Sequence, residues 1–221
     1  MPNRDSGLDE ALRASADTAD DDLKVRLLAE FHHGRALSTL LPLLRSKNDN
    51  AARTGAWIAS ELGKVGKELL PDIRPLLGHH DPIVRFFVLD CILNWASIEA
   101  GPTLADAVEL IYDVSSAVRW KALRFIASAS VGQLDAARSS LGPASIEAGH
   151  LEWLISPDAR DPVGVSRRLR ASDAVTRKYA LVAAARLSPV TNEPLIEASR
   201  VADPEARQFA SDTLSLSVHR A

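Results

Sequence analysis

Arginine recurs at regular intervals along this chain, and a row of guanidinium groups has the chemistry to bind phosphate or carboxylate. Each copy follows a small or branched residue, and the six pairs are Val25-Arg26, Ala52-Arg53, Val84-Arg85, Val118-Arg119, Thr176-Arg177 and Ala206-Arg207. An arginine at one fixed repeat position can instead bind the carbonyls or an aspartate of a neighbouring turn, and the turns here supply both. We therefore expect these arginines to hold the fold together.

Two adjacent histidine pairs, His32-His33 and His79-His80, are the other residues with obvious site chemistry. Neighbouring side chains on a helix point about 100° apart, and no HExxH or CxxC spacing accompanies either pair. No glycine-rich phosphate loop, nucleophile elbow or Ser-His-Asp arrangement is indicated by spacing. We expect no metal, no cofactor and no enzymatic activity, and we expect the single cysteine, Cys91, to be buried.

The spacing of the arginines indicates helical hairpins in series. Their numbers differ by 27, 32, 34, 58 and 30, and the value of 58 is close to two periods. A period in this range is typical of stacked helical repeats. The missing copy is expected within 143–155, where apolar residues have helical spacing. Turn signals that mark the start of a second helix stand before most pairs: Asp49-Asn50, Asp81-Pro82, Ser115-Ser116, Asp173 and Asp203-Pro204.

A small residue recurs four positions after the residue that precedes each arginine. The six residues are Ala29, Ala56, Val88, Ala122, Ala180 and Ala210, so five of the six are alanine. This face, together with the residues seven positions on, should face the core. The first helix of each hairpin is predicted from apolar periodicity over residues 36–44, 69–77, 104–112, 161–170 and 194–199, with kinks expected at Pro42 and Pro75. The total is about seven hairpins.

With its aspartate-proline turn, valine-arginine pair and spaced alanines, the chain resembles the HEAT-repeat family over roughly residues 8–218. The resemblance implies an all-α fold, a right-handed α-solenoid of about seven stacked HEAT-like hairpins. It also implies a single repeat domain over 8–218 after a flexible amino terminus at 1–7. This architecture is shared by many functions.

Composition limits the classes of function. The formal net charge of −3 argues against a general nucleic-acid binder, because phosphate contacts depend on clustered lysine and arginine. No segment reaches the roughly 20 apolar residues of a membrane span, and the first residues lack the apolar core of a signal peptide. We therefore expect a cytoplasmic protein that does not enter a membrane.

The residues two and six positions beyond the start of each copy point away from the alanine face, and in related solenoids this side lines the concave surface. In the middle of the chain these positions hold Phe86, Asp90, Trp120 and Arg124. Aromatic residues beside charged ones resemble the anchors of protein interfaces. The alternative is that Phe86 and Trp120 pack against the next hairpin.

We expect a non-enzymatic solenoid that binds another protein. A compact acidic solenoid is similar to bacterial immunity proteins, which neutralise a toxin by binding it, and a basic toxin or nuclease domain would be attracted by acidic residues. The expected contributors of charge are Asp20, Asp21, Asp22 and Asp113. A generic scaffold or regulatory adaptor is the alternative within the same class.

Resemblance to two HEAT-like enzyme groups gives further alternatives. HEAT-like DNA glycosylases remove alkylated bases with tryptophans, an aspartate and an arginine, which Trp120, Trp153, Asp90 and Arg124 match by residue type only. HEAT-like lyases that attach bilin chromophores share only the repeat.

Overall fold

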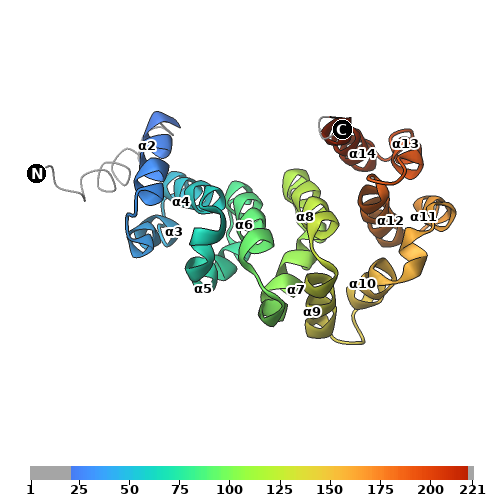
Figure 1. Cartoon of the computed structure of the whole chain (residues 1–221), viewed down its shortest axis with the longest axis horizontal. Helices are drawn as coiled ribbons and strands as arrows, with labels where there is room; N and C mark the ends of the chain where they lie inside the picture. The colour runs from blue at the N-terminus through green and yellow to red at the C-terminus, as the bar shows by residue number, and fades with distance from the viewer. Residues whose placement is uncertain (1–20, 219–221) are drawn as a thin grey trace, which may run out of the picture. The chain divides into compact units, whose positions relative to one another are not determined.

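A computed structural model describes residues 21–218 and shows an all-helical protein (Figure 1). Within these residues there are thirteen α-helices, six 3₁₀ helices and no strand. The chain forms two compact units, with the boundary between Ala96 and Ser97. The flexible terminus predicted for 1–7 and the predicted contact residue Asp20 lie outside the described residues. The single domain predicted over 8–218 stays a prediction.

The first unit alternates long α-helices with shorter segments that mix 3₁₀ and α-helical turns. Its elements are α2 (Asp21–His32), η1 (Leu37–Leu40), α3 (Leu41–Leu44), α4 (Asp49–Glu61), η2 (Gly63–Leu69), α5 (Leu70–Ile73), η3 (Arg74–Gly78) and α6 (Pro82–Trp95). The short segments correspond to the predicted first helices at 36–44 and 69–77. Pro42 and Pro75 lie in the first turn of α3 and η3, so each proline begins a new segment at the place where a kink was expected.

Turn residues start the long helices of the first unit. Asp81 is the N-cap of α6 and accepts a hydrogen bond from the amide of Ile83, as its position before Pro82 predicts. The N-cap of α4 is Asn48 rather than Asp49, so this helix begins one residue earlier than predicted. Helix α4 packs against α2, α3 and α6, and α6 packs in turn against η2, α5 and η3.

The predicted core face is confirmed from α4 onward but is wrong for α2. Ala56 and Val88 are fully buried, as is Cys91. In α2 the corresponding Ala29 is exposed, whereas the two residues assigned to the outer face, Leu27 and Phe31, are buried. The first copy therefore packs against α4 through the opposite face of the helix.

The second unit contains one helix, α9 (Val131–Leu141), that the repeat pattern did not predict. Its elements are η4 (Ile98–Ala100), α7 (Gly101–Glu109), η5 (Leu110–Tyr112), α8 (Ser116–Ser128), α9 (Val131–Leu141), α10 (Ile146–Ile155), η6 (Pro157–Arg160), α11 (Pro162–Leu169), α12 (Ala174–Leu187), α13 (Glu193–Ala198) and α14 (Pro204–Val218). Helix α10 confirms the helix predicted within 143–155, and it spans Ile146–Ile155. Helix α9 was not predicted.

Helices α9 and α10 interrupt the order of packing in the second unit. Helix α9 packs against α7 and α10, and α11 packs against α12. Helix α8 packs against α12 and also contacts α14 (Figure 1). Helix α12 carries the next copy of the arginine motif, so consecutive copies are neighbours in space although α9, α10 and α11 lie between them in the sequence. In α8, α12 and α14 the predicted core alanines, Ala122, Ala180 and Ala210, are fully buried.

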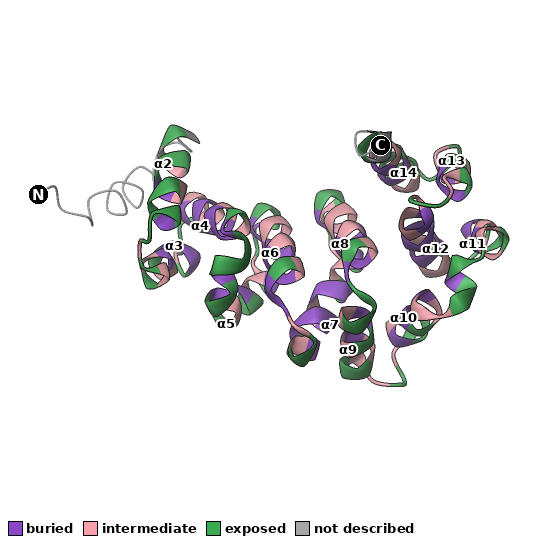
Figure 2. Ribbon diagram, viewed as in Figure 1, coloured by how far each residue is buried: buried purple, intermediate pink, exposed green. Residues whose placement is uncertain are grey.

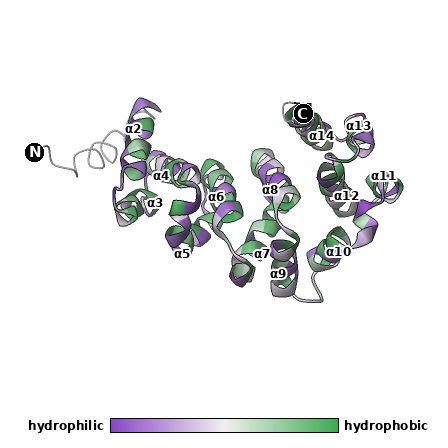
Figure 3. Ribbon diagram, in the orientation of Figure 1, coloured by the Kyte–Doolittle hydropathy of each residue, from purple (hydrophilic) through white to green (hydrophobic). Residues whose placement is uncertain are grey.

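Hydrophobic and hydrophilic residues occur together along the helical ribbons (Figure 3). Among residues 21–218 no helix combines the length and the apolar character that crossing a bilayer requires.

Candidate functional site

Four of the six repeat arginines bind backbone carbonyls of the turns that precede their own helices, whereas the sequence predicted contacts to neighbouring hairpins. In these four a guanidinium nitrogen donates to backbone carbonyls five or six residues earlier in the chain. The acceptors are the carbonyls of His79 and His80 for Arg85, of Asp113 and Val114 for Arg119, of Ala171 and Ser172 for Arg177, and of Val201 for Arg207. These groups therefore satisfy carbonyls at the hairpin turns rather than forming an open anion-binding ladder.

Arg53 makes the bridge between neighbouring hairpins that the sequence also allowed. Its guanidinium pairs with the carboxylate of Asp81, which is almost fully buried. Asp81 also caps α6, so one carboxylate fixes the start of α6 and attaches it to α4.

In the first unit, the predicted contact residues Phe86 and Asp90 lie one turn apart on α6. Both residues are partly exposed, whereas Val88 between them is fully buried. Buried, intermediate and exposed residues all occur along the ribbon of α6 (Figure 2). The ring of Phe86 meets that of Phe87 edge to face, with 5.7 Å between the centroids. This part of α6 therefore presents aromatic and acidic side chains together at its surface.

In the second unit, the predicted contact residues Trp120 and Arg124 are similarly placed on α8. Both are partly exposed, and the guanidinium of Arg124 lies 5.8 Å from the centroid of the Trp120 ring. The Trp120 ring also meets Phe209 of α14 edge to face, with 6.4 Å between the centroids. Trp120 therefore contributes to packing inside its unit as well as to the surface.

The predicted acidic contributors are not equivalent. Asp22 is exposed on α2, and the side chain of Asp21 lies outside the described residues. The carboxylate of Asp113 accepts a hydrogen bond of 2.8 Å from the amide of Ser115 and so supports the turn before α8. Asp113 therefore has a local structural role in addition to its charge.

A cluster of charged and aromatic residues joins α8, α12 and α14, and the sequence did not predict it. Arg119 pairs with Glu205, and Nζ of Lys178 donates 2.8 Å to the carbonyl of Ile111 and lies 5.3 Å from the ring centroid of Tyr112. The hydrogen bonds from Arg119 lower the pKa of Glu205, and burial lowers the pKa of Lys178. Only the repeated spacing of Arg119 signalled this cluster, because its partners come from distant repeats.

Tyr112 extends this cluster to α10. Its hydroxyl donates to Glu147 at 2.7 Å, and burial is the main cause that raises the pKa of Tyr112. Burial also opposes ionisation of Glu147, but hydrogen bonds from Ser145 and Tyr112 outweigh it and lower its pKa. The carboxylate is therefore held as a charged acceptor.

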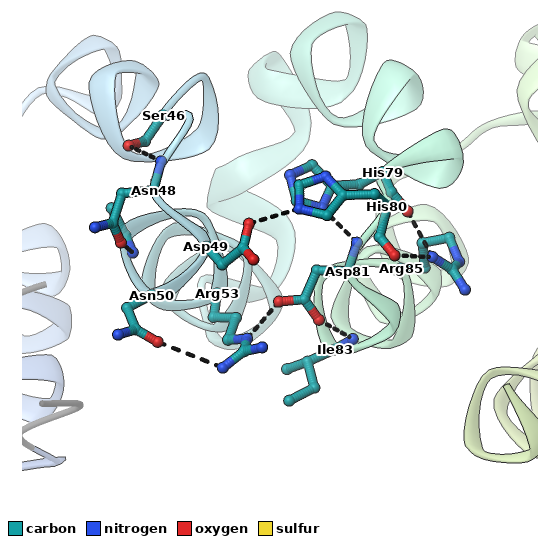
Figure 4. A network of polar contacts seen from close by, with 11 residues as sticks. Ser46, Asn48, Asp49, Asn50, Arg53, His79, His80, Asp81, Ile83 and Arg85 are labelled. Carbon is teal, nitrogen blue, oxygen red and sulfur yellow. Dashed lines mark hydrogen bonds and ion pairs between the residues drawn. The ribbon is translucent and has the colours of Figure 1, made fainter. Parts of the chain in front are cut away.

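His79 and His80 do not lie on a helix, which corrects the reasoning that separated their rings. They occupy the connection between η3 and α6, where the backbone of His79 is extended, with φ −62° and ψ 140°. Their rings stack with 4.4 Å between centroids and an interplanar angle of 29°. Nε2 of His80 lies 2.7 Å from Oδ1 of Asp49, and the amide of Asp81 donates to Nδ1 of His79 at 3.1 Å (Figure 4).

The four residues that match the glycosylase set by type lie on three different helices: α6, α8 and α10. The guanidinium carbon of Arg168 lies 4.2 Å from the centroid of the Trp153 ring on α10, whereas the Trp120 ring meets Phe209 of α14. Asp90 belongs to the first unit. No observation within the described residues favours base excision.

Comparisons with known proteins leave the family open. No family model matches the chain, and no curated protein matches it. Crystal structures of two engineered proteins are similar in part. The first is 17% identical with a TM-score of 0.43, and the match covers 83% of this chain and 96% of the engineered chain. The second is 16% identical with a TM-score of 0.47, and the match covers 98% of this chain and 94% of the engineered chain. These comparisons identify no activity.

Proposed function

We propose that this chain is a non-enzymatic, protein-binding α-solenoid of the right-handed kind, with HEAT-like hairpins as its repeating unit. Within each unit, long helices that begin at similar turns pack against one another and bury alanine or valine at one position. Arginine at the same position binds a turn in five of the six copies, from Arg53 onward. Residues that differ between copies are therefore the ones available for recognition.

The observation that carries the proposal is the repeated pairing of a partly exposed aromatic residue with an ionic residue one turn later. Phe86 and Asp90 form one such pair and Trp120 and Arg124 the other, at equal positions in α6 and α8. Aromatic residues and arginine dominate binding energy at protein interfaces. The pairs supply apolar contact area together with charge that selects the partner.

The particular function we propose is that of an immunity protein, which neutralises a cognate bacterial toxin by binding it. The net charge of −3 favours a basic partner such as a nuclease domain, through faster association. A generic scaffold or adaptor would use the same two residue pairs without toxin neutralisation.

The test is binding of the purified chain to a basic toxin domain encoded beside it, followed by an assay of toxin activity in the complex. We expect Phe86→Ala and Trp120→Ala each to weaken binding by about 2 kcal/mol or more. Val65→Ala on η2 and Val131→Ala on α9 remove exposed apolar side chains from other elements and serve as controls. Circular dichroism of each variant separates lost contacts from lost folding.

The possible results have distinct meanings. Tight binding that neither variant weakens would contradict the assignment of the surface. Binding that leaves the toxin active would support an adaptor and contradict immunity. An association rate that does not fall with added salt would contradict the role given to charge.

A further inference from the structure

Three side chains with metal-binding atoms meet between α4 and α6 in the first unit. Asp49 is the first residue of α4, and His79 and His80 belong to the connection that precedes α6. One ligand atom from each of the three residues lies within 4.8 Å of the other two. The set combines two imidazole nitrogens with one carboxylate oxygen (Figure 4).

The backbone that carries the two histidines is fixed by contacts that do not involve their rings. The buried guanidinium of Arg85 donates to the carbonyl of His79 at 2.5 Å and to that of His80 at 3.0 Å. Asp81, the next residue, is held by Arg53 and caps α6. The histidine backbone is therefore attached to α6 before any ligand binds.

The backbone of the third residue is equally restrained, while its side chain is open to solvent. Asn48 accepts a hydrogen bond from the amide of Ala51 and fixes the first turn of α4, where Asp49 lies. The side chains of His80 and Asp49 are 70% and 45% exposed. A fixed backbone with exposed ligand atoms limits the reorganisation needed for binding and gives an ion a path of entry.

We propose that Asp49, His79 and His80 form a binding site for a divalent ion of the zinc type, completed by water. Imidazole and carboxylate ligands suit Zn²⁺, and three protein ligands leave one tetrahedral position open. With metal–ligand distances of about 2.0 to 2.2 Å, tetrahedral geometry requires ligand atoms about 3.3 to 3.5 Å apart. The 2.7 Å contact between His80 and Asp49 therefore has to open slightly. The separations of the His79 ligand atom from the other two are within 4.8 Å, and rotation of the side chains can adjust them.

The arrangement of His79 favours a metal over an ion pair alone. A His80–Asp49 pair requires only one imidazole, whereas the stacked ring of His79 brings a second nitrogen donor to the same carboxylate. A metal bound to Nδ1 of His79 displaces the amide of Asp81. A metal bound to Nε2 leaves the ring proton on Nδ1, which then cannot accept from that amide, so either route breaks the hydrogen bond.

Isothermal titration of the full chain, free of any affinity tag, with ZnCl₂ tests the site. We expect one ion per chain and a loss of affinity of at least about 10-fold in His79→Ala and in His80→Ala, since loss of a supporting residue beyond the ligands already costs 10- to 100-fold. His33→Ala removes an exposed histidine at the end of α2 and should bind as the unaltered chain does. Titration with Co²⁺ offers a second readout, because Co²⁺ in a tetrahedral site absorbs visible light intensely. His79→Ala and His80→Ala should both lose this absorption.

Two results would overturn the proposal. One is the absence of saturable Zn²⁺ binding in a chain that circular dichroism shows to be folded, which would leave His80 and Asp49 as an ion pair only. The other is equal affinity in His79→Ala, His80→Ala and the unaltered chain, which would place the ion elsewhere. Neither result depends on whether the chain binds a protein.

Discussion

Arg119 of α8 and Glu205 of α14 lie 86 residues apart in the sequence, and their ion pair joins the first turns of these two helices. Nε of Arg119 donates to Oε2 of Glu205 at 3.0 Å, and Nη2 pairs with the second oxygen. The third nitrogen, Nη1, donates to the carbonyls of Asp113 and Val114. We predict that Arg119→Ala destabilises the protein more than Glu205→Ala does, because only the arginine also supports its turn.

The magnitudes follow from exposure. The side chain of Arg119 is 21% exposed and that of Glu205 is 42% exposed, so solvent screens the pair. An exposed pair contributes about 0.2 to 1 kcal/mol, and the two-bonded geometry places this one near 1 kcal/mol. The hydrogen bonds from a charged donor to the turn carbonyls add about 1.5 to 3 kcal/mol. We therefore expect losses of about 1 kcal/mol for Glu205→Ala and about 3 kcal/mol for Arg119→Ala.

A double-mutant cycle separates these contributions. Urea unfolding of the unaltered chain, both single variants and the double variant gives the coupling energy, which should be near 1 kcal/mol at low salt and smaller at high salt. Coincident transitions by circular dichroism and tryptophan fluorescence are required for this treatment. A coupling below about 0.3 kcal/mol, or equal losses in the two single variants, would refute the reasoning.

The same pair gives a pH dependence of defined sign. Because Arg119 lowers the pKa of Glu205 in the folded state, this contribution is present above the pKa of an unfolded glutamate and is lost as the pH falls through the folded value. The stability difference between the unaltered chain and Glu205→Gln should therefore be constant near neutral pH and should shrink in acid. A difference that grows on acidification would contradict this sign.

Three further predictions concern packing and capping. A Cβ at Gly66 would overlap the ring of Trp95, so Gly66→Ala should lower the free energy of unfolding by about 1 to 3 kcal/mol, with a lower melting temperature. The matched control is Gly149→Ala in α10, where a Cβ meets no atom within 4 Å; it should stabilise by about 0.5 to 1 kcal/mol. Asp161 accepts hydrogen bonds from two amides at the start of α11, so Asp161→Ala should cost about 1 kcal/mol in urea unfolding, whereas no loss would show that the cap is dispensable.

Helix starts were predictable because their determinants are local. Asp81 and Asp173 cap α6 and α12 through amides two or three residues further on, so a short stretch of sequence contains the whole interaction. The unpredicted helix α9 also carried a local signal. Ser130 and Gln133 form a capping box, and the serine-to-glutamine spacing of three residues could have identified it.

The face that a helix buries was less predictable, because it depends on what the helix packs against. The pair Val25-Arg26 repeats the motif, yet α2 buries Leu27 and Phe31 and exposes Ala29. Two residues identify a copy of the motif but not the rotation of its helix. The apolar pair Leu27 and Phe31, one turn apart, would have been the better guide to the core.

The proposed metal site could not be predicted from residue types, because adjacent histidines have different geometry on a helix and in an extended turn. His79 follows η3 with an extended backbone, and the stacking of its ring on His80 depends on that turn. Asp49 joins them only through the packing of α4 against α6. Spacing within the sequence contains neither fact.

Arg119 shows how a repeated residue combines a predictable role with an unpredictable one. Its Nη1 binds carbonyls five and six residues earlier, as does that of Arg177, so this contact belongs to the motif. Its Nε and Nη2 reach Glu205 because α8 contacts α14. Helix α8 packs directly against α12, while α9 packs against α7 and α10 instead. The repeat therefore specifies how each turn is closed, whereas the irregular pair of helices determines which distant residue the remaining nitrogens meet.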